Sequence, residues 1–312
     1  MPSRLVRYWY QRSTILTSAI GWRVTRHCVA SVVHQMSLRP CSTFLKVEIS
    51  LPGKSWLSTV DDASDSIEFR DIVIVGGGCY GSFYAGQLER ARARDRVTYR
   101  QLLIVDRDAD CQLARESNND DTRRLVVQEW GDFFDDYLTT VEVSEGGGPP
   151  DAIVPSPLMP HLMYEWLVRR ARCRWPRRMI ETRHVTTAPG TPYDVSAPDG
   201  TRYISFADWI CPTHCIEPAL CPVIRAPRTW EMADTMENLT RKLNEVHPTA
   251  GPVLLVCEHR VFGVGMFDVS AVLSGDRTVA AAGQRGSPID VLVGTISSCH
   301  GAVNLLHLGV GS

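Results

Sequence analysis

The sequence is poor in lysine, in net charge and in long apolar runs. Only 3 of its 33 basic residues are lysines, a bias that a GC-rich genome explains and that folding does not require. The formal net charge is -2, so the chain as a whole has no bias toward nucleic acid or anionic membranes. No stretch reaches the roughly 18 uninterrupted apolar residues of a membrane-spanning helix. We therefore expect a cytoplasmic protein without a membrane span or a nucleic-acid partner.

Acidic residues are nearly absent from the N-terminal segment. Residues 1–60 carry eight Lys or Arg and a single acid, Glu48, and they show no core-forming period. We interpret residues 1–66 as a basic extension without a packed core. It is either a targeting sequence, mitochondrial in a eukaryote, or a stretch translated upstream of the native start, for which Met36 is an internal candidate. The folded domain is predicted to span residues 67–312.

A glycine-rich turn follows the first buried strand of that domain. Residues 71–75 (DIVIV) form a continuous apolar run after one acid, which is typical of a strand buried on both faces. The next residues place Gly76, Gly78 and Gly81 in the pattern G-x-G-x-x-G. In this pattern the first glycine permits a tight turn, the second lets a pyrophosphate approach the backbone, and the third lets the helix pack closely on the strand.

The turn is expected to contact phosphate through its backbone and through Cys79 and Tyr80. A helix is predicted from Tyr80 to Arg94, with its N-terminal N–H groups facing the phosphates. A second strand, 101–105, ends at Asp106, where a carboxylate can accept hydrogen bonds from ribose hydroxyls. Arg107 follows at the position that would meet a 2′-phosphate, with a solvated surface arginine as the alternative.

Over residues 71–106 the chain resembles the Rossmann fingerprint of NAD(P)- and FAD-binding proteins, which implies one of these cofactors. The strand and helix patterns alternate beyond this unit, and alternation of this kind predicts an α/β fold with a doubly wound, mostly parallel Rossmann-like sheet. We expect residues 67–312 to form one domain with a Cys-rich insertion at about 209–230.

The insertion holds the most unusual motif of the sequence. Cys211, Cys215 and Cys221 have the spacing C-x3-C-x5-C, and three prolines between 212 and 222 forbid a regular helix. A stiff loop that gathers thiols suits a metal, because its ligands must converge with little entropy left to lose. We predict a zinc or iron–sulfur site here, with redox-active thiols or structural cysteines as alternatives. The expected fourth ligand is His214 or Cys79.

Two further Cys/His pairs follow predicted strands: Cys257 with His259, and Cys299 with His300. Either pair can supply ligands, catalytic groups or packed side chains. The sequence therefore favours an NAD(P)- or FAD-dependent oxidoreductase acting on an unidentified small molecule or protein. A second hypothesis is an adenylating enzyme. The chain resembles the E1/ThiF group at 76–82 (GGGCYGS), at 106–108 (DRD) and at Ser117-Asn118, but lacks that group's C-x-x-C pairs. A non-catalytic nucleotide-sensing protein is the third.

Overall fold

The computed structural model describes residues 66–116, 121–143, 148–212 and 215–311. The N-terminal extension, the Ser117-Asn118 pair and His214 lie outside these ranges, so the predictions made for them have no structural counterpart here. Within the described ranges, no helix is both long enough and apolar enough to cross a membrane.

The glycine turn belongs to the first of two six-stranded sheets, whose order is β11-β12-β4-β1-β2-β3. Strands β4, β1, β2 and β3 are parallel, whereas β12 pairs antiparallel with β4, and β11 antiparallel with β12. The strands of this sheet are β1 (Ile67–Val75), β2 (Val97–Asp106), β3 (Arg123–Val127), β4 (Ala152–Val154), β11 (Glu258–Val261) and β12 (Val264–Asp268). The helices that follow its parallel strands are α3 (Cys79–Arg92), α4 (Gln112–Arg115), α5 (Trp130–Val143) and α6 (Leu162–Arg174).

The second sheet is mostly antiparallel. Its main path is β10-β13-β14-β7-β6, and β5 also pairs with β14. Only β10 and β13 run parallel. Its strands are β5 (Arg178–Arg183), β6 (Tyr193–Ser196), β7 (Arg202–Ser205), β10 (Thr249–Val256), β13 (Ile289–Ile296) and β14 (His300–Gly311). The remaining elements are α7 (Met232–Val246), α8 (Val269–Gln284) and the small hairpin β8 (Leu220–Cys221) with β9 (Ala226–Pro227).

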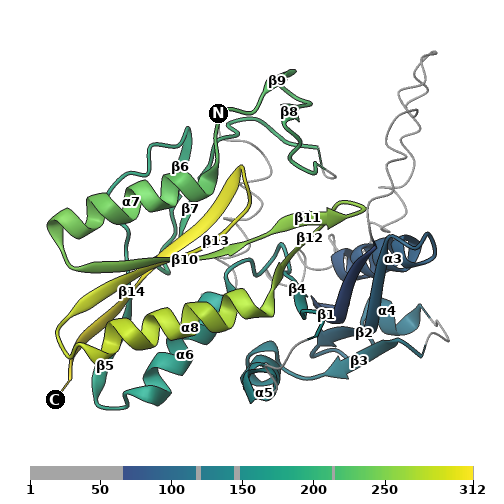
Figure 1. Ribbon diagram of the computed structural model, residues 1–312, viewed down its shortest axis with the longest axis horizontal. Coiled ribbons are helices and arrows are strands. Elements are labelled where there is room, and N and C mark those ends of the chain that lie inside the picture. Colours follow the sequence, from purple (N-terminus) through teal and green to yellow (C-terminus); the bar gives the residue numbers. More distant parts are fainter. Residues whose placement is uncertain (1–65, 117–120, 144–147, 213–214, 312) are drawn as a thin grey trace, which may run out of the picture.

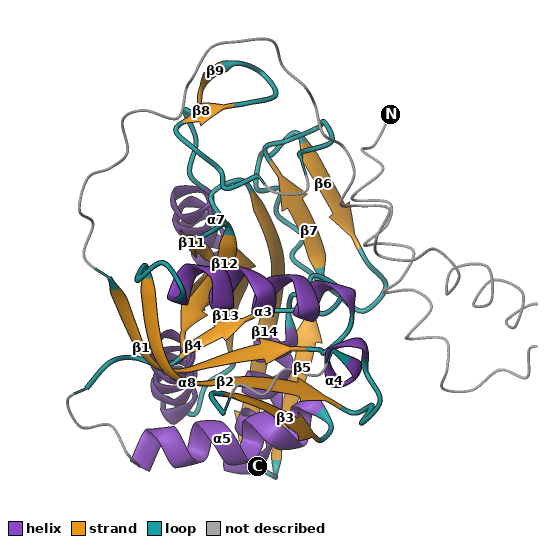
Figure 2. Ribbon diagram, turned by 90° about the vertical axis from the view of Figure 1, so that its right-hand side faces the viewer, coloured by secondary structure: helices purple, strands orange, loops and turns teal. Residues whose placement is uncertain are grey.

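Helices separate the two sheets and cover their outer faces. Alternate residues of β1, such as Val73 and Val75, join the large core with α5, α6, α8 and the near face of the second sheet. The other residues of β1, such as Ile72 and Ile74, pack under α3 and the β11–β12 hairpin. Helix α7 covers the far face of the second sheet. Figure 1 shows α7 on one side of β10, β13 and β14, with α6 and α8 on the other, and Figure 2 shows α3 and α5 on opposite sides of β1–β3.

The prediction of a doubly wound, mostly parallel sheet is therefore wrong. The chain forms two mixed sheets, and the parallel arrangement is confined to β3-β2-β1-β4 and to the β10–β13 pair. The prediction rested on the alternation of strand and helix patterns along the chain, which does not reveal that β14 pairs antiparallel with β13, β7 and β5. In the structure, helices cover both faces of the second sheet, so its antiparallel strands are as apolar as buried parallel strands.

Candidate functional site

The glycine turn between β1 and α3 is held by backbone contacts that glycine alone permits. Gly76 has φ of +89°, a conformation that side chains disfavour. A β-carbon at Gly81 would lie 3.0 Å from the carbonyl carbon of Gly76 and closer still to its oxygen. A β-carbon at Gly78, by contrast, would meet nothing within 4 Å. The third glycine is therefore required by the fold, whereas the second is not.

The turn presents an exposed backbone at the beginning of α3. Gly78 is the N-cap residue, and Gly78, Cys79 and Tyr80 are all exposed. No side chain caps this helix end, and its first turn contains no acidic residue. N–H groups and a positive dipole end are thus left facing outward, which is the arrangement that binds phosphate.

Asp106 and the residues after it support the turn from β2. The Asp106 carboxylate accepts hydrogen bonds from the Gly77 amide at 2.6 Å and from the Asp108 amide at 2.9 Å. A carboxylate has about four acceptor positions, so two remain for a ligand. The Leu113 amide donates to the Gly77 carbonyl at 2.9 Å. The sequence predicts a role for Asp106 toward ribose, but it does not reveal that this carboxylate also accepts a hydrogen bond from the turn.

Arg107, predicted to lie at the 2′-phosphate position, is exposed. Its guanidinium lies 4.0 Å from Glu129, and both side chains are more than 60% solvent-exposed. An ion pair of this kind contributes little and leaves the arginine able to reorient. Its predicted role toward a 2′-phosphate stays a prediction.

The second region of interest is where the cysteine loop meets the ends of β10 and β13. Cys211, Cys215 and Cys221 are free and half-buried, as are Cys257 and the more deeply buried Cys299. Glu217, inside the loop, has a φ of +51° and a side chain only 8% exposed. The structure thus brings the C-x3-C-x5-C motif to the strand-end Cys/His pairs, although these segments are far apart in sequence.

Glu217 and His300 lie at the centre of this region. Ser297 Oγ donates to Glu217 Oε1 at 2.7 Å, and that oxygen lies 3.9 Å from His300 Nε2. His300 Nε2 is also 3.9 Å from Cys211 Sγ. The other ring nitrogen, Nδ1, lies 2.9 Å from Ser205 Oγ, whose hydroxyl donates to the Ala207 carbonyl. Nδ1 is then the protonated nitrogen, and Nε2 directs its lone pair toward the loop.

Burial sets the protonation of this region. It raises the pKa of Cys211 to about 11, and the neighbouring Cys215 and Cys221 add to the rise. Burial likewise raises the pKa of Cys257 and that of Cys299 to about 12, with the Glu217 charge as the second cause. Without a bound cation these three groups are therefore neutral thiols near pH 7, which argues against free thiolate nucleophiles.

The two imidazoles respond to burial in the opposite sense. Burial lowers the pKa of His259 and of His300, partly opposed in each by the Glu217 charge. Neutral imidazole is the form that binds metals. In the described part of the chain, however, no three His, Cys, Asp or Glu groups stand close enough together to hold a metal ion as they are. Metal binding by Cys211, Cys215 and Cys221 stays a prediction.

Of the two expected fourth ligands, His214 lies outside the described residues and Cys79 opens α3. Cys79 is not one of the free cysteines of the described chain, and its role as a ligand stays a prediction.

The β11–β12 hairpin packs between the cysteine loop and the residues that follow α3. Cys257 Sγ and His259 Nε2 lie over Gly265 of β12, 3.1 Å and 3.6 Å from where its β-carbon would stand. At the tip of the hairpin, Gly263 faces the Ile216 side chain of the cysteine loop. The Phe262 ring lies under the guanidinium of Arg94, which follows α3, at 5.4 Å. The hairpin therefore contacts the cysteine loop and the C-terminal end of α3, the end opposite the glycine turn.

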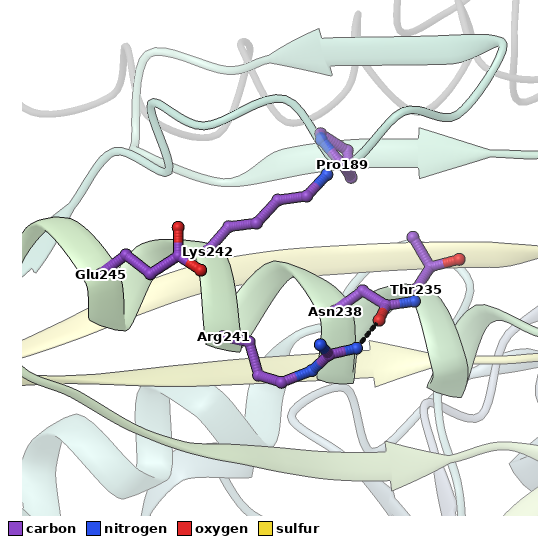
Figure 3. A pocket seen from close by; sticks show the side chains of 6 residues that line it. All are labelled: Pro189, Thr235, Asn238, Arg241, Lys242 and Glu245. Carbon is purple, nitrogen blue, oxygen red and sulfur yellow. Dashed lines mark hydrogen bonds between the residues drawn. The ribbon is translucent and has the colours of Figure 1, made fainter.

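Two surface hollows lie away from these regions. One is formed on α7 by Thr235, Asn238, Arg241, Lys242 and Glu245, with Pro189 opposite (Figure 3). Arg241 is hydrogen-bonded to Asn238, and Figure 3 shows Lys242 extending toward Pro189. The other hollow lies along the first halves of β1 and β2 and contains Phe69, Tyr99 and Arg100. Neither contains any of the predicted site residues.

Comparison with known proteins gives a partial match. Residues 163–309 are similar to a protein family described as "uncharacterized protein, C-terminal domain". The matched range begins in α6 and ends in β14, so it includes the cysteine loop and both Cys/His pairs but not the glycine turn. No curated protein and no solved structure matches the chain.

Proposed function

We propose that this protein binds a dinucleotide, NAD(P) or FAD, at the β1–α3 turn and acts as a cytoplasmic oxidoreductase. The observation that carries the proposal is the form of the turn: Gly81 packs on the Gly76 carbonyl, while Gly78 leaves open space before an uncapped, exposed helix end. The fold itself does not require a glycine at position 78. A ligand that approaches the backbone there would explain why this residue is a glycine.

Two parallel strand pairings of β1 support the same proposal. β1 pairs with β2 over most of its length, and β4 lies on its other side. The turn therefore lies at the carboxyl ends of parallel strands, where ligands bind in open α/β sheets. Asp106 ends the neighbouring strand and keeps acceptor positions for ribose hydroxyls.

The oxidoreductase part of the proposal rests on the cysteine region. We infer a metal or iron–sulfur site in the loop of Cys211, Cys215 and Cys221, because these cysteines are free, half-buried and near enough to one another to influence the ionisation of Cys211. The β11–β12 hairpin contacts both the cysteine loop and the C-terminal end of α3, the helix that begins at the proposed nucleotide site.

The test is to titrate the purified full chain with NAD⁺, NADP⁺ and FAD, and to record its absorption spectrum and metal content. Binding of one of these cofactors together with a metal or a chromophore is the expected result. A colourless, metal-free protein that binds none of the three contradicts the proposal. Nucleotide binding in a protein without metal or chromophore favours a nucleotide-sensing role over an oxidoreductase.

A further inference from the structure

The buried carboxylate of Glu217 has no cation beside it. Among the described residues no Lys or Arg forms an ion pair with it, and its nearest basic group is the His300 imidazole at 3.9 Å. Within the part of the chain that the structure describes, its carboxylate accepts one hydrogen bond from a hydroxyl, that of Ser297. Because burying an unpaired charge is costly, carboxylates in this position are usually paired or bound to a metal.

The backbone at Glu217 is strained, and its side chain is buried. Its φ of +51° is in the left-handed region, which non-glycine residues seldom adopt, and its flanking residue Pro218 limits the alternatives. Glu217 therefore has two unfavourable features, a left-handed backbone and a buried carboxylate that has no cation beside it among the described residues. Such strain is retained where the surroundings impose it, frequently at functional sites.

His300 is oriented toward the same point. Its Nδ1–H donates to Ser205, a side chain that is itself buried, so Nε2 faces Glu217 and Cys211. Histidines that bind metals commonly donate their second ring N–H to a fixed neighbour in this manner. Ser205 lies on β7 and His300 begins β14, which places this orientation on two paired strands and not on the loop.

The two separations from His300 exceed those of a zinc site by about half an ångström. With Zn–S of about 2.3 Å and Zn–N or Zn–O of about 2.0–2.1 Å, tetrahedral ligands stand roughly 3.3–3.6 Å apart. His300 Nε2 is 3.9 Å from both Cys211 Sγ and Glu217 Oε1. Cys211 Sγ and Glu217 Oε1 therefore need to approach His300 Nε2 by about half an ångström to complete the coordination.

We propose that Cys211, Glu217 and His300 bind one divalent metal of the Zn²⁺ type and leave one coordination position open. This rests on the metal part of the proposed function and specifies it, with a mixed S/O/N ligand set for the metal of the cysteine loop. Three protein donors with an open fourth position are the pattern of catalytic rather than structural zinc. A metal of this kind polarises a substrate oxygen.

The test is Co²⁺ binding by the metal-free full chain, followed by displacement with Zn²⁺. We expect one equivalent of Co²⁺ with visible d–d absorption and a near-ultraviolet thiolate-to-cobalt band. Cys211→Ser should remove the thiolate band. His300→Ala and Glu217→Gln should each weaken Co²⁺ binding at least tenfold. Cys173→Ser, a free and exposed cysteine of α6, is the matched control and should bind as the unmodified protein does.

Glu217→Gln also separates lost binding from lost folding. The amide keeps the size of the carboxylate and can still accept from Ser297, but it removes the buried charge. The metal-free variant should therefore unfold at the same or a higher urea concentration than the metal-free parent, while its metal affinity falls.

The proposal is overturned if Glu217→Gln and His300→Ala bind Co²⁺ as tightly as the parent while Cys215→Ser and Cys221→Ser abolish binding. It is also overturned if the chain binds no divalent metal at micromolar concentration, or if it carries an iron–sulfur chromophore. Titration of the metal-free protein with NAD⁺, NADP⁺ and FAD tests the nucleotide-binding proposal separately. A failure of the metal site can therefore be told from a failure of nucleotide binding.

Discussion

Replacing Gly81 by alanine tests the packing of the glycine turn between β1 and α3. The added methyl group would lie 3.0 Å from the Gly76 carbonyl carbon and nearer to its oxygen, whereas relaxed carbon–carbon contacts are about 3.5–4.0 Å. The obstacle is backbone and cannot rotate away, so α3 must shift relative to β1. Overpacking of this kind costs about 3 kcal/mol, the upper part of its usual range.

The intrinsic helix preference of alanine offsets part of this cost. Alanine stabilises a helix interior by about 0.5–1 kcal/mol relative to glycine, so Gly81→Ala should lower the stability by about 2 kcal/mol. Gly86→Ala in the same helix is the matched control. Its methyl group meets nothing within 4 Å, and it should therefore raise the stability by about 0.5–1 kcal/mol.

Urea unfolding followed by tryptophan fluorescence and far-ultraviolet circular dichroism measures both variants. The two midpoints should move in opposite directions, with a difference between the variants of about 3 kcal/mol. A Gly81→Ala protein that is as stable as the parent would refute the account of close strand–helix packing. So would a shift of both variants in the same direction.

Three further predictions concern other parts of the molecule. Burial lowers the pKa of His161 to about 3, whereas a histidine in the unfolded chain has a pKa of about 6.5. As the pH falls, the unfolded chain therefore binds a proton at His161 before the folded protein does. Stability should fall as the pH drops from 6.5 toward 3, by up to about 1.4 kcal/mol per pH unit, and His161→Gln should flatten this slope in urea titrations. Asp276→Ala should cost about 1–3 kcal/mol because it leaves Arg174 without its buried partner, whereas exposed Asp135→Ala should cost under about 1 kcal/mol. Arg107→Ala should weaken NADP⁺ binding and leave NAD⁺ binding unchanged in calorimetric titration, and equal effects on both would exclude a 2′-phosphate contact.

The sequence predicted the first unit of the fold well because its determinants are local. The strand at 71–75 lies within β1, the helix at 80–94 nearly coincides with α3, and the strand at 101–105 lies within β2. The β-branched runs, the glycine pattern and the terminal acid all act within a few residues of one another. The exposed backbone at the start of α3 could therefore be predicted directly from the motif.

The second sheet could not be predicted because its pairing is non-local. β14 pairs with β13, β7 and β5, which lie at very different distances along the chain. The prediction also missed α8 and the β11–β12 hairpin. The turn of this hairpin is formed by Phe262 and Gly263, both with positive φ, and the glycine was the signal present in the sequence.

The cysteine region was recognised only in part for the same reason. The C-x3-C-x5-C spacing drew attention to the thiols, and the strand-end pairs at 257–259 and 299–300 were noted separately. That Glu217 faces His300 depends on how the loop folds onto β13 and β14, which no local pattern reveals. The role of Ser205 in orienting His300 is likewise a product of strand pairing.

The most direct test of the account is the effect of Gly78→Ala on cofactor affinity. Gly78 has extended backbone angles and open space at its β-carbon position, so alanine should leave the free protein folded. A methyl group there would meet an incoming pyrophosphate. For whichever of NAD⁺, NADP⁺ and FAD the parent binds, Gly78→Ala should raise Kd at least tenfold, about 1.4 kcal/mol, while Gly86→Ala leaves Kd unchanged. Equal affinity in all three proteins, or no cofactor bound by any of them, would contradict the assignment of this turn as a nucleotide site.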